Sequence, residues 1–337
     1  MILVTGGTGL VGSHLLLELL KSGKKVRAIH RKDSNLQAVR TVFSFYLPAD
    51  EIDHLFNKIE WKEANLNDIH ALTQAFSGIT CVYHCAALIS FDPSDLKLLR
   101  KTNIEGTANI VNLCVSYKIT KLCYISSIAT MDKSLGEKSV TENFTWNQEK
   151  NHNEYAISKH GAEIEVWRGT QEGVPAIILN PGVILGPGFW KSGSGQLFEK
   201  IDKGLNYNFP KTTGFVGVMD VVNAAIITME SNIQNEQFIV VSENLNFTEV
   251  LRLIAESIQK PSPKIPLKPW MVYMGWIFQY ITHFFFGTKK VISREDYKSL
   301  FRKSFYNNSK LKSVFSLEFT PINEVISETG KIFRKKH

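Results

Sequence analysis

Short apolar runs alternate with segments of helical spacing over the first half of the chain. Consecutive apolar residues are typical of parallel strands that are buried on both faces, whereas helices repeat their apolar residues every three or four positions. The expected strands are Ile2 to Val4, Lys25 to His30, Ile59 to Glu63, Cys81 to His84, Lys121 to Ser126 and Ala176 to Leu179. The expected helices are Leu15 to Leu20, Ile69 to Phe76, Asn103 to Ser116 and one that begins near Glu154. This alternation predicts an α/β fold, in which helices wrap both faces of a doubly wound parallel sheet with right-handed crossovers.

The pattern changes after Pro181, where glycine and proline become dense. Such residues indicate loops that leave the sheet, so a smaller C-terminal substrate lobe is expected from this point. We expect residues 1–180, with a returning segment at about 215–242, to form the large domain, and residues 181–214 and 243–337 to form the lobe. An insert from Asn35 to Asn57 carries enough apolar residues for one or two extra surface helices.

The glycine-rich stretch Thr5-Gly-Gly-Thr-Gly-Leu-Val-Gly12 joins the first strand to the first helix. Glycines at these places allow a tight turn, close approach of the backbone to a ligand and close packing of helix on strand. The N–H groups at the positive end of the new helix face the turn, where a pyrophosphate is favoured. The strand before and the helix after are the context that dinucleotide binding by a Rossmann fold requires. The expected contacts with the dinucleotide are Gly6, Gly7, Thr8, Gly9, Leu10, Val11 and Gly12.

The end of the second strand bears on the choice of cofactor. A site for NAD usually places an acidic residue about 20 residues beyond the glycine turn, where it bonds the ribose 2′-hydroxyl. Here the strand ends in His30-Arg31-Lys32, and cationic side chains pair with the 2′-phosphate of NADP. Arg31, supported by Lys32, therefore predicts NADP. Asp33 keeps NAD open as the alternative if the strand runs longer.

Composition and cysteine content are those of an ordinary globular protein. Of 337 residues, 44% are hydrophobic and 21% are charged, and the chain is long enough to bury a large core. The N-terminus has no signal-peptide pattern, so a cytoplasmic location and reduced cysteines are expected. The segment Cys81-Val-Tyr-His84-Cys85 superficially suggests metal ligands, but alternate residues of a strand point to opposite faces. We therefore expect no metal site.

The net charge of +7 is concentrated at the C-terminal end. Residues 289–337 contain twelve Lys and Arg against five Asp and Glu, an excess that equals that of the whole chain. A solvated face is the ordinary explanation, and no nucleic-acid partner is expected. The aromatic stretch Trp270 to Phe286 is too short and too polar for a transmembrane helix, so we expect it to roof a hydrophobic substrate pocket. Peripheral membrane contact of the 270–303 region stays open as the alternative.

A phenol and an ammonium stand four residues apart in Tyr155-Ala-Ile-Ser-Lys159. At this spacing both side chains lie on one face of a helix, about one turn apart. Ser126 and Ser127 come at the end of the fifth strand, at the same edge of the sheet as the glycine turn. Ligands of open parallel sheets bind outside the carboxyl ends of the strands. The serine pair, the Tyr/Lys pair and the glycine turn are therefore expected to converge on one site.

Together these features resemble the short-chain dehydrogenase/reductase superfamily, in the extended branch that contains the NAD-dependent epimerases and dehydratases. The resemblance covers nearly all of residues 1–260 and continues weakly to the end of the chain. The motifs that carry it are Thr5-Gly-Gly-Thr-Gly-Leu-Val-Gly12, Asn65-Leu-Asn-Asp68, His84-Cys-Ala-Ala87, Asn103-Ile-Glu-Gly-Thr107, Ser126-Ser127, Tyr155-x-x-x-Lys159 and Asn180-Pro-Gly-Val183. So many motifs in the right order are not explained by a chance match.

The resemblance implies a role for four polar residues. Tyr155 would donate or accept a proton at the substrate oxygen, and Lys159 would bind the nicotinamide ribose and lower the pKa of the tyrosine. Ser127 would hydrogen-bond the reacting carbonyl, with Ser126 as the alternative because the choice is a one-residue register question. Asn103 would support a water or backbone path beside the lysine. A free phenol has a pKa of about 10, so a nearby ammonium and an oxidised nicotinamide would move that pKa toward the working pH.

Further cofactor contacts are implied by the same resemblance. They are Asn65, Leu66, Cys85, Ala86, Ala87, Lys159, Pro181 and Val183. Where the family usually has Asp at the adenine contact, this chain has Asn65. Its amide oxygen can still accept a hydrogen bond from the adenine amino group.

At two places the sequence departs from motifs of the superfamily, and these departures reduce the number of possible reactions. Nucleotide-sugar epimerases often carry an arginine just before Asp220, where this chain has Met219, and dehydratases place acidic residues where it has Ile128-Ala129. The pattern looks most like the group of dihydroflavonol reductases, cinnamoyl-CoA reductases and aldehyde reductases, and 3β-hydroxysteroid dehydrogenases are also similar. We therefore expect an NADPH-dependent reductase of an apolar ketone or aldehyde, with Tyr155 as the proton donor.

Two alternatives stay open: a nucleotide-sugar epimerase with bound NAD, and a non-catalytic regulator that senses NAD(P). Such regulators generally lack the Tyr/Lys pair, which favours an enzyme. The expected partner is a small-molecule carbonyl substrate, whose identity is not readable from the loops after Pro181. Homodimers through paired helices are common in the superfamily, and the sequence leaves the oligomeric state open.

Overall fold

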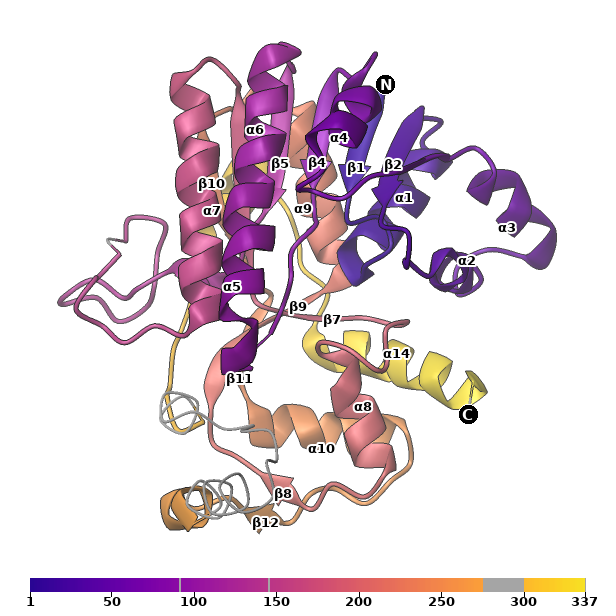
Figure 1. Cartoon of the computed structure of the whole chain (residues 1–337). Helices are drawn as coiled ribbons and strands as arrows, with labels where there is room; N and C mark the ends of the chain where they lie inside the picture. Colours follow the sequence, from indigo (N-terminus) through magenta and orange to yellow (C-terminus); the bar gives the residue numbers. More distant parts are fainter. Residues whose placement is uncertain (91, 145, 275–299, 337) are drawn as a thin grey trace.

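The largest part of the protein is built on a seven-stranded parallel sheet (Figure 1). The computed structural model describes residues 1–90, 92–144, 146–274 and 300–336. The strands of the sheet are β1 (Ile2–Thr5), β2 (Val26–His30), β3 (Glu60–Glu63), β4 (Cys81–His84), β5 (Lys121–Ile125), β6 (Ala176–Pro181) and β10 (Glu236–Val240). Their spatial order is β10-β6-β5-β4-β1-β2-β3, so the winding reverses between β1 and β4. This is the doubly wound Rossmann arrangement, and the fold expected from the sequence is confirmed.

Helices cover both faces of this sheet. The helices α4 (Ile69–Phe76), α6 (Gly106–Ser116) and α7 (Glu154–Gln171) lie in front of it in Figure 1, and α1 (Leu10–Lys21) and α9 (Val218–Glu230) pack on the opposite face. Each face has its own hydrophobic cluster, so the sheet is sandwiched between two apolar layers.

Strand β5 contributes side chains to the hydrophobic layers on both faces of the sheet. Leu122 and Tyr124 join the cluster under α6 and α7, whereas Cys123 and Ile125 join the cluster under α1 and α9. All four side chains are buried, since successive residues of a strand point to opposite faces and both faces are covered. This burial explains why the strand appears in the sequence as an apolar run instead of an alternating one.

The insert between β2 and β3 forms two short helices, α2 (Leu36–Phe43) and α3 (Ala49–Phe56), as its apolar residues predict. The side chain of Asn35 caps α2 by accepting a hydrogen bond from the backbone N–H of Ala38 at 3.3 Å. Phe43 of α2 is fully buried in the cluster under α1. The insert is therefore an extension of the same core.

A smaller lobe lies at the carboxyl edge of the large sheet, in the lower part of Figure 1. Its elements are β7 (Val183–Leu185), α8 (Gly195–Asp202), β8 (Tyr207–Asn208), β9 (Thr212–Gly217), β11 (Glu243–Asn246), α10 (Phe247–Ser257), β12 (Ile265–Pro266) and α14 (Ile322–Lys336). Strands β11, β9 and β7 form a three-stranded sheet, and β12 pairs with β8. A separate hydrophobic cluster, rich in aromatic rings, fills the space between this sheet and helices α8, α10 and α14.

The chain crosses between the two parts more than once. Strand β9 belongs to the small sheet, whereas α9 and β10, which follow it, belong to the large one. Helix α13 (Ser309–Phe315) packs on β10 and buries Leu311 there. Asp220 in the first turn of α9 accepts hydrogen bonds from the backbone N–H and the hydroxyl of Thr320, at 3.2 and 3.0 Å. These contacts tie the end of the chain to both parts.

Within the described part of the chain, no helix is long and apolar enough to cross a membrane. Of the aromatic stretch Trp270 to Phe286, the structure describes residues 270–274, where Trp270, Tyr273 and Met274 are exposed. The rest of the expected pocket roof, and residues 275–299 of the 270–303 region, lie outside the described residues.

Candidate active site

The glycine turn between β1 and α1 is closely packed on the backbone around it. Gly6 has a φ of +69°, and a Cβ atom there would lie 2.6 Å from the backbone nitrogen of Ala86. A Cβ atom on Gly12 would lie 2.2 Å from the carbonyl oxygen of Gly6. Both distances are shorter than any real Cβ contact, so only glycine fits these two positions. The turn thus has the tight bend and the close helix packing that its sequence predicts.

The N-terminus of α1 is suited to an anion. Gly9 is the N-cap residue and has no side chain to satisfy the first N–H groups, and the first turn of the helix contains no acidic residue. The exposed N–H groups and the helix dipole therefore favour a negatively charged ligand at the turn. The residues present fit the pyrophosphate of a dinucleotide.

A buried histidine, His84, forms hydrogen bonds next to the glycine turn. The Nδ1 atom of His84 lies 2.6 Å from the hydroxyl of Thr5, and its Nε2 atom lies 3.0 Å from the hydroxyl of Thr107. Burial lowers the pKa of His84 to about 3, so the ring is neutral and offers one donor and one acceptor to the two hydroxyls. The hydroxyl of Thr5 also accepts from the backbone N–H of Ala86 at 3.2 Å. These bonds join the ends of β1 and β4 to α6.

The Tyr/Lys pair lies at the start of α7, on one face of the helix. The side chain of Asn153 caps this helix by accepting from the backbone N–H of Ala156 at 2.8 Å. Lys159 is buried: its Nζ donates to the carbonyl oxygen of Ile125 at 2.7 Å and lies 4.3 Å from the centre of the Tyr124 ring. The lysine therefore reaches the carboxyl end of β5, as the sequence predicts for a site at this edge.

The two serines after β5 point to different partners. Ser127 hydrogen-bonds the Tyr155 hydroxyl, and its own oxygen accepts from the backbone N–H of Ala129 at 3.1 Å. Ser126 instead donates to the buried carboxylate of Glu163 at 2.5 Å. The geometry therefore brings Ser127, and not Ser126, to the tyrosine.

Asn103 lies in a π-helical turn, Arg100–Glu105, that leads into α6. Its side-chain oxygen accepts from the backbone N–H of Leu88 at 2.7 Å, and its amide nitrogen donates to the carbonyl oxygen of the same residue at 3.0 Å. The amide also donates to the hydroxyl of Ser158, beside Lys159, at 2.9 Å. Asn103 thus joins the segment after β4 to α7, at the residue that precedes the lysine in the sequence.

The acid–base properties of the pair differ in one respect from the sequence expectation. Burial raises the pKa of the Tyr155 hydroxyl to about 12, and the hydrogen bond from Ser127 opposes this shift without reversing it. The pKa of the phenol therefore lies above its ordinary value in the protein alone, because desolvation of the phenolate outweighs the hydrogen bond from Ser127. The lowering expected from the lysine together with an oxidised nicotinamide stays a prediction. Burial also lowers the pKa of Lys159 to about 7, while Glu163 and Cys85 oppose that shift. The tyrosine is a protonated donor at neutral pH, and the lysine is close to its titration midpoint.

The residues expected to select the cofactor lie on an exposed turn after β2. The Nε atom of Arg31 lies 3.5 Å from a carboxylate oxygen of Asp33, with 64% and 76% of the two side chains exposed. An exposed ion pair is weak, so it does not prevent either side chain from binding a ligand. Lys32 is exposed on the same turn. The structure therefore brings both candidate groups to one place.

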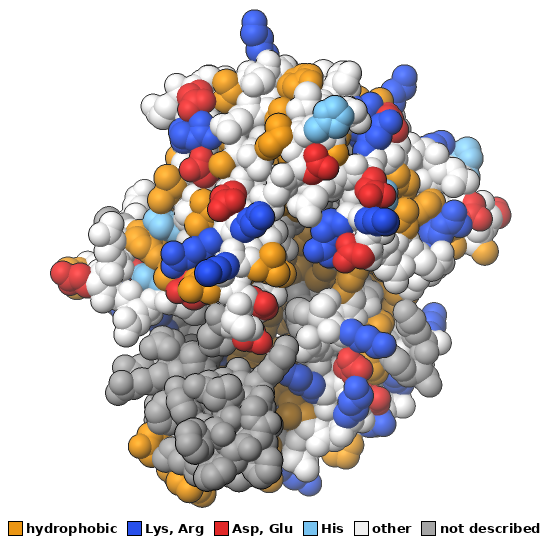
Figure 2. Space-filling view, in the orientation of Figure 1, with side chains coloured by type: hydrophobic (Ala, Val, Ile, Leu, Met, Phe, Trp, Pro, Cys, Tyr) orange, Lys and Arg blue, Asp and Glu red, His pale blue; other side chains and the backbone are white. Residues whose placement is uncertain are grey.

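The remaining expected cofactor contacts follow the ends of the strands. They are Asn65 and Leu66 after β3, Cys85, Ala86 and Ala87 after β4, Pro181 at the end of β6, and Val183 at the start of β7. Asn65 already uses its side-chain oxygen to accept from the backbone N–H of Asn67 at 3.2 Å. An amide oxygen has two lone pairs, so one remains for a ligand. Figure 2 shows a hollow with hydrophobic side chains between the large sheet and the smaller lobe, on the side where these strands end.

Sequence reasoning missed one group of buried polar residues beside the Tyr/Lys pair. Glu163, Thr130, Asn180 and Gln237 are at most 8% exposed and hydrogen-bond one another. Helical spacing could have revealed Glu163, because it stands four residues after Lys159 on α7. The other three come from separate elements and have no common pattern in the sequence.

A dinucleotide turn and a Ser/Tyr/Lys cluster at the same sheet edge define an NAD(P)-dependent enzyme of the short-chain dehydrogenase/reductase class. Comparison with known families agrees with this class. Residues 2–241 match the NAD dependent epimerase/dehydratase family, and the chain belongs to that family. Its members bind a nicotinamide cofactor, as the resemblance implied.

Individual relatives include both reductases and epimerases. A putative dihydroflavonol 4-reductase from Synechocystis is 25% identical over 98% of this chain and 94% of its own length. Sterol demethylase protein B from Methylococcus capsulatus is 26% identical over 79% of this chain and 77% of its own length. The solved UDP-glucose 4-epimerase of Thermotoga maritima has a TM-score of 0.78 and 20% identity, and the match covers 99% of both chains. The last of these likenesses concerns the fold alone.

Proposed function

We propose that the protein is an NADPH-dependent reductase of an apolar ketone or aldehyde, with Tyr155 as the proton donor. The observation that carries this proposal is the hydrogen bond between the hydroxyls of Ser127 and Tyr155, beside a buried Lys159. Two hydroxyl donors at one place can hold a carbonyl oxygen between them and stabilise the negative charge that develops on it.

The cofactor would be held by the glycine turn and by Lys159. The N–H groups at the start of α1 would bind the pyrophosphate, and the lysine would bond the nicotinamide ribose. When bound, the reduced cofactor supplies a hydride to the carbonyl carbon of the substrate.

The residues of the chain would supply the rest of the reaction. Tyr155 gives its proton to the carbonyl oxygen, so that the carbonyl becomes an alcohol and the tyrosine becomes a phenolate. A phenol with a pKa raised to about 12 gives up its proton reluctantly, but the hydrogen bond from Ser127 stabilises the phenolate. The ammonium of Lys159, one turn further on the same helix face, would add to that stabilisation. The phenolate then regains a proton from solvent.

A preference for NADPH over NADH is part of the proposal. It rests on Arg31 and Lys32, which stand on the exposed turn after β2 where the adenosine ribose of a bound dinucleotide is expected. A guanidinium forms charge-assisted, two-pronged hydrogen bonds with a phosphate.

The apolar character of the substrate is supported by the lobe and by the departures from the epimerase pattern. Met219 stands where epimerases often carry an arginine that binds a diphosphate, and hydrophobic side chains are visible in the hollow between the large sheet and the lobe (Figure 2). The relatives named as a dihydroflavonol reductase and a sterol demethylase protein agree with a flat or extended apolar substrate.

The test is NADPH oxidation, followed at the nicotinamide absorbance band, over a panel of aldehydes, ketones and steroids. Wild type is expected to turn over members of the panel, and Tyr155→Phe to lose activity by a factor on the order of a thousand. A Tyr155→Phe variant that retains wild-type turnover would show that the tyrosine is not the acid. Turnover of UDP-sugars with tightly held NAD, and none with the panel, would favour an epimerase instead.

A further inference from the structure

A buried carboxylate outside this mechanism lies one helical turn beyond Lys159. Glu163 on α7 is 2% exposed, and its Oε1 atom accepts four hydrogen bonds. The donors are Ser126 at 2.5 Å, Thr130 at 2.8 Å, Asn180 at 2.7 Å and Gln237 at 3.4 Å. Ser126 follows β5, Asn180 belongs to β6 and Gln237 belongs to β10. One carboxylate oxygen therefore joins three neighbouring strands to the helix that carries Tyr155 and Lys159.

The same network holds the backbone of Ser127. The amide of Asn180 donates to the carbonyl oxygen of Ser127 at 3.1 Å, and the hydroxyl of Thr130 lies 2.9 Å from that oxygen. The side chain of Ser127 in turn bonds Tyr155. If this end of β5 moved, Ser127 would leave its place beside the tyrosine, and displacements of about 1 Å are costly for catalysis.

Glu163 also faces the lysine, because residues four apart lie on one face of a helix. Its negative charge raises the pKa of Lys159 and opposes the larger effect of burial, which lowers that pKa to about 7. The other groups around the lysine are the Tyr124 ring, the thiol of Cys85 and the neutral ring of His84, and Nδ1 of His160 lies 3.8 Å from Oε2 of Glu163. Glu163 is the carboxylate that acts on the pKa of Lys159, and none of these other groups is a carboxylate.

We propose that Glu163 is a positioning residue of the reaction, which anchors the Ser127 end of β5 to α7 and provides the counter-charge for the ammonium of Lys159. This proposal rests on the reductase function proposed above. A glutamine at position 163 would offer an oxygen to the same four donors but no charge. The two parts of the role can therefore be separated by substitution.

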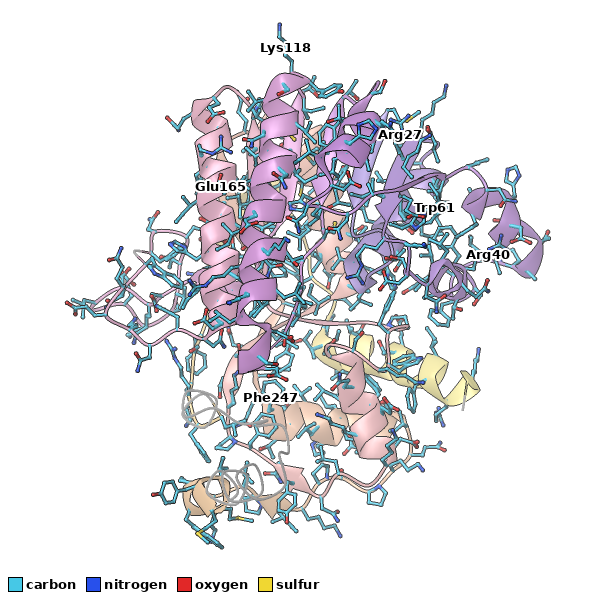
Figure 3. All side chains as sticks on the ribbon, in the orientation of Figure 1. Arg27, Arg40, Trp61, Lys118, Glu165 and Phe247 are labelled. Carbon is cyan, nitrogen blue, oxygen red and sulfur yellow. The ribbon has the colours of Figure 1, made fainter. Side chains whose placement is uncertain are left out.

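The test compares Glu163→Gln and Ser126→Ala with wild type, by kcat and KM for NADPH from pH 5.5 to 9. With E163Q, the loss of kcat at alkaline pH should move about one unit toward lower pH, while kcat at pH 5.5 and KM stay near wild type. With S126A, kcat should fall about tenfold at every pH, with an unchanged midpoint. Glu165→Gln is the matched control: Glu165 lies on the same helix, paired with Arg168 at 2.8 Å, and its profile should match wild type (Figure 3).

Each outcome decides one part of the proposal. A midpoint that stays at the wild-type value in E163Q overturns the counter-charge, and wild-type kcat in S126A overturns the anchor. If E163Q does not fold, S126A decides alone, and wild-type kcat in it overturns the whole proposal. Tyr155→Phe separates failure of the reductase function from failure of the role proposed for Glu163. If it keeps its turnover, the reductase function itself has failed, whereas its loss beside wild-type profiles of E163Q and S126A rejects only the role of Glu163.

Discussion

The carboxyl edge of the large sheet and the core of the smaller lobe are both buried, yet they are built from opposite kinds of side chain. At the sheet edge the buried groups are polar, and Glu163, Asn103 and Lys159 each have at least one hydrogen-bond partner. In the lobe, the rings of Trp190, Phe198 and Phe333 pack together with centroids 5.0 to 6.0 Å apart.

This difference teaches how the two regions can change. Hydrogen bonds depend on direction and distance, so a polar network tolerates little movement of its strands. Hydrophobic packing is not directional, and apolar residues of similar volume can replace one another. The sheet edge is therefore expected to determine the chemistry, and the lobe to determine stability and substrate shape. Figure 3 shows Phe247 in the lobe and Lys118 at the far end of the large sheet.

The largest effect is expected from a cavity in the lobe. Phe198→Ala removes a ring that is 1% exposed, and should lower the free energy of unfolding by about 3–5 kcal/mol. Chemical denaturation measures this change, and the affinity for NADPH, from fluorescence titration, should stay at the wild-type value. Tyr207→Ala is the control, because Tyr207 in the same lobe is 45% exposed and should cost about 0.5 kcal/mol or less. Loss of NADPH binding in Phe198→Ala, at a temperature where this variant is folded, would contradict the idea that the lobe core determines stability and not cofactor binding.

Two buried lysines in the sheet region distinguish a role in catalysis from a role in stability. Lys159→Met should lower kcat by a factor on the order of a hundred, because the phenolate of Tyr155 loses its nearby ammonium. Lys121 donates to the carbonyl oxygens of Thr228 and Ser231 near the end of α9, at 2.6 and 2.8 Å, so Lys121→Met should lower stability and leave kcat unchanged. Steady-state kinetics and thermal unfolding of both variants separate the two roles. Equal losses of kcat would mean that the lysine at the site acts only through stability.

A change of cofactor preference is expected at the turn after β2. Arg31→Glu removes charge-assisted hydrogen bonds to a 2′-phosphate. The dissociation constant for NADPH should therefore rise by about tenfold to a hundredfold, so that NADH becomes the preferred cofactor. Dissociation constants of both cofactors measure the effect. Arg40→Glu serves as the control, since Arg40 lies on α2 and stacks 4.3 Å from the Phe56 ring (Figure 3). A wild type that binds both cofactors equally would remove the basis of the argument from Arg31.

The dependence of kcat on pH is expected to follow the charge of Lys159. The pKa of Lys159 is lowered to about 7, so the lysine is charged below that pH and neutral above it. The pKa of Tyr155 is raised to about 12, and the phenol therefore stays protonated throughout the measured range. In the direction of reduction, kcat should be highest below pH 7 and fall by about tenfold per unit above it. A kcat that stays constant to pH 9 would show that the charge of the lysine is not needed.

Local sequence was sufficient for the parts of the site that lie within one strand–turn–helix unit or on one helix. The glycines from Gly6 to Gly12 and the pair Tyr155 and Lys159 are such cases, because backbone geometry and helical spacing act over a few residues. The alternation of apolar runs and helical segments likewise predicted the Rossmann fold, since parallel strands between two layers of helices leave that pattern.

Only the tertiary structure decided which side chains face one another. Ser126 and Ser127 are equivalent in the sequence, and the packing of β5 against α7 turns one to Glu163 and the other to Tyr155. The pKa directions were decided in the same way, because burial depends on everything packed around a group. Burial raised the pKa of Tyr155, although the hydrogen bond from Ser127 alone would lower it. Spacing along the chain carries information about neighbours on one element, whereas desolvation and hydrogen bonding between elements arise only when the chain is folded.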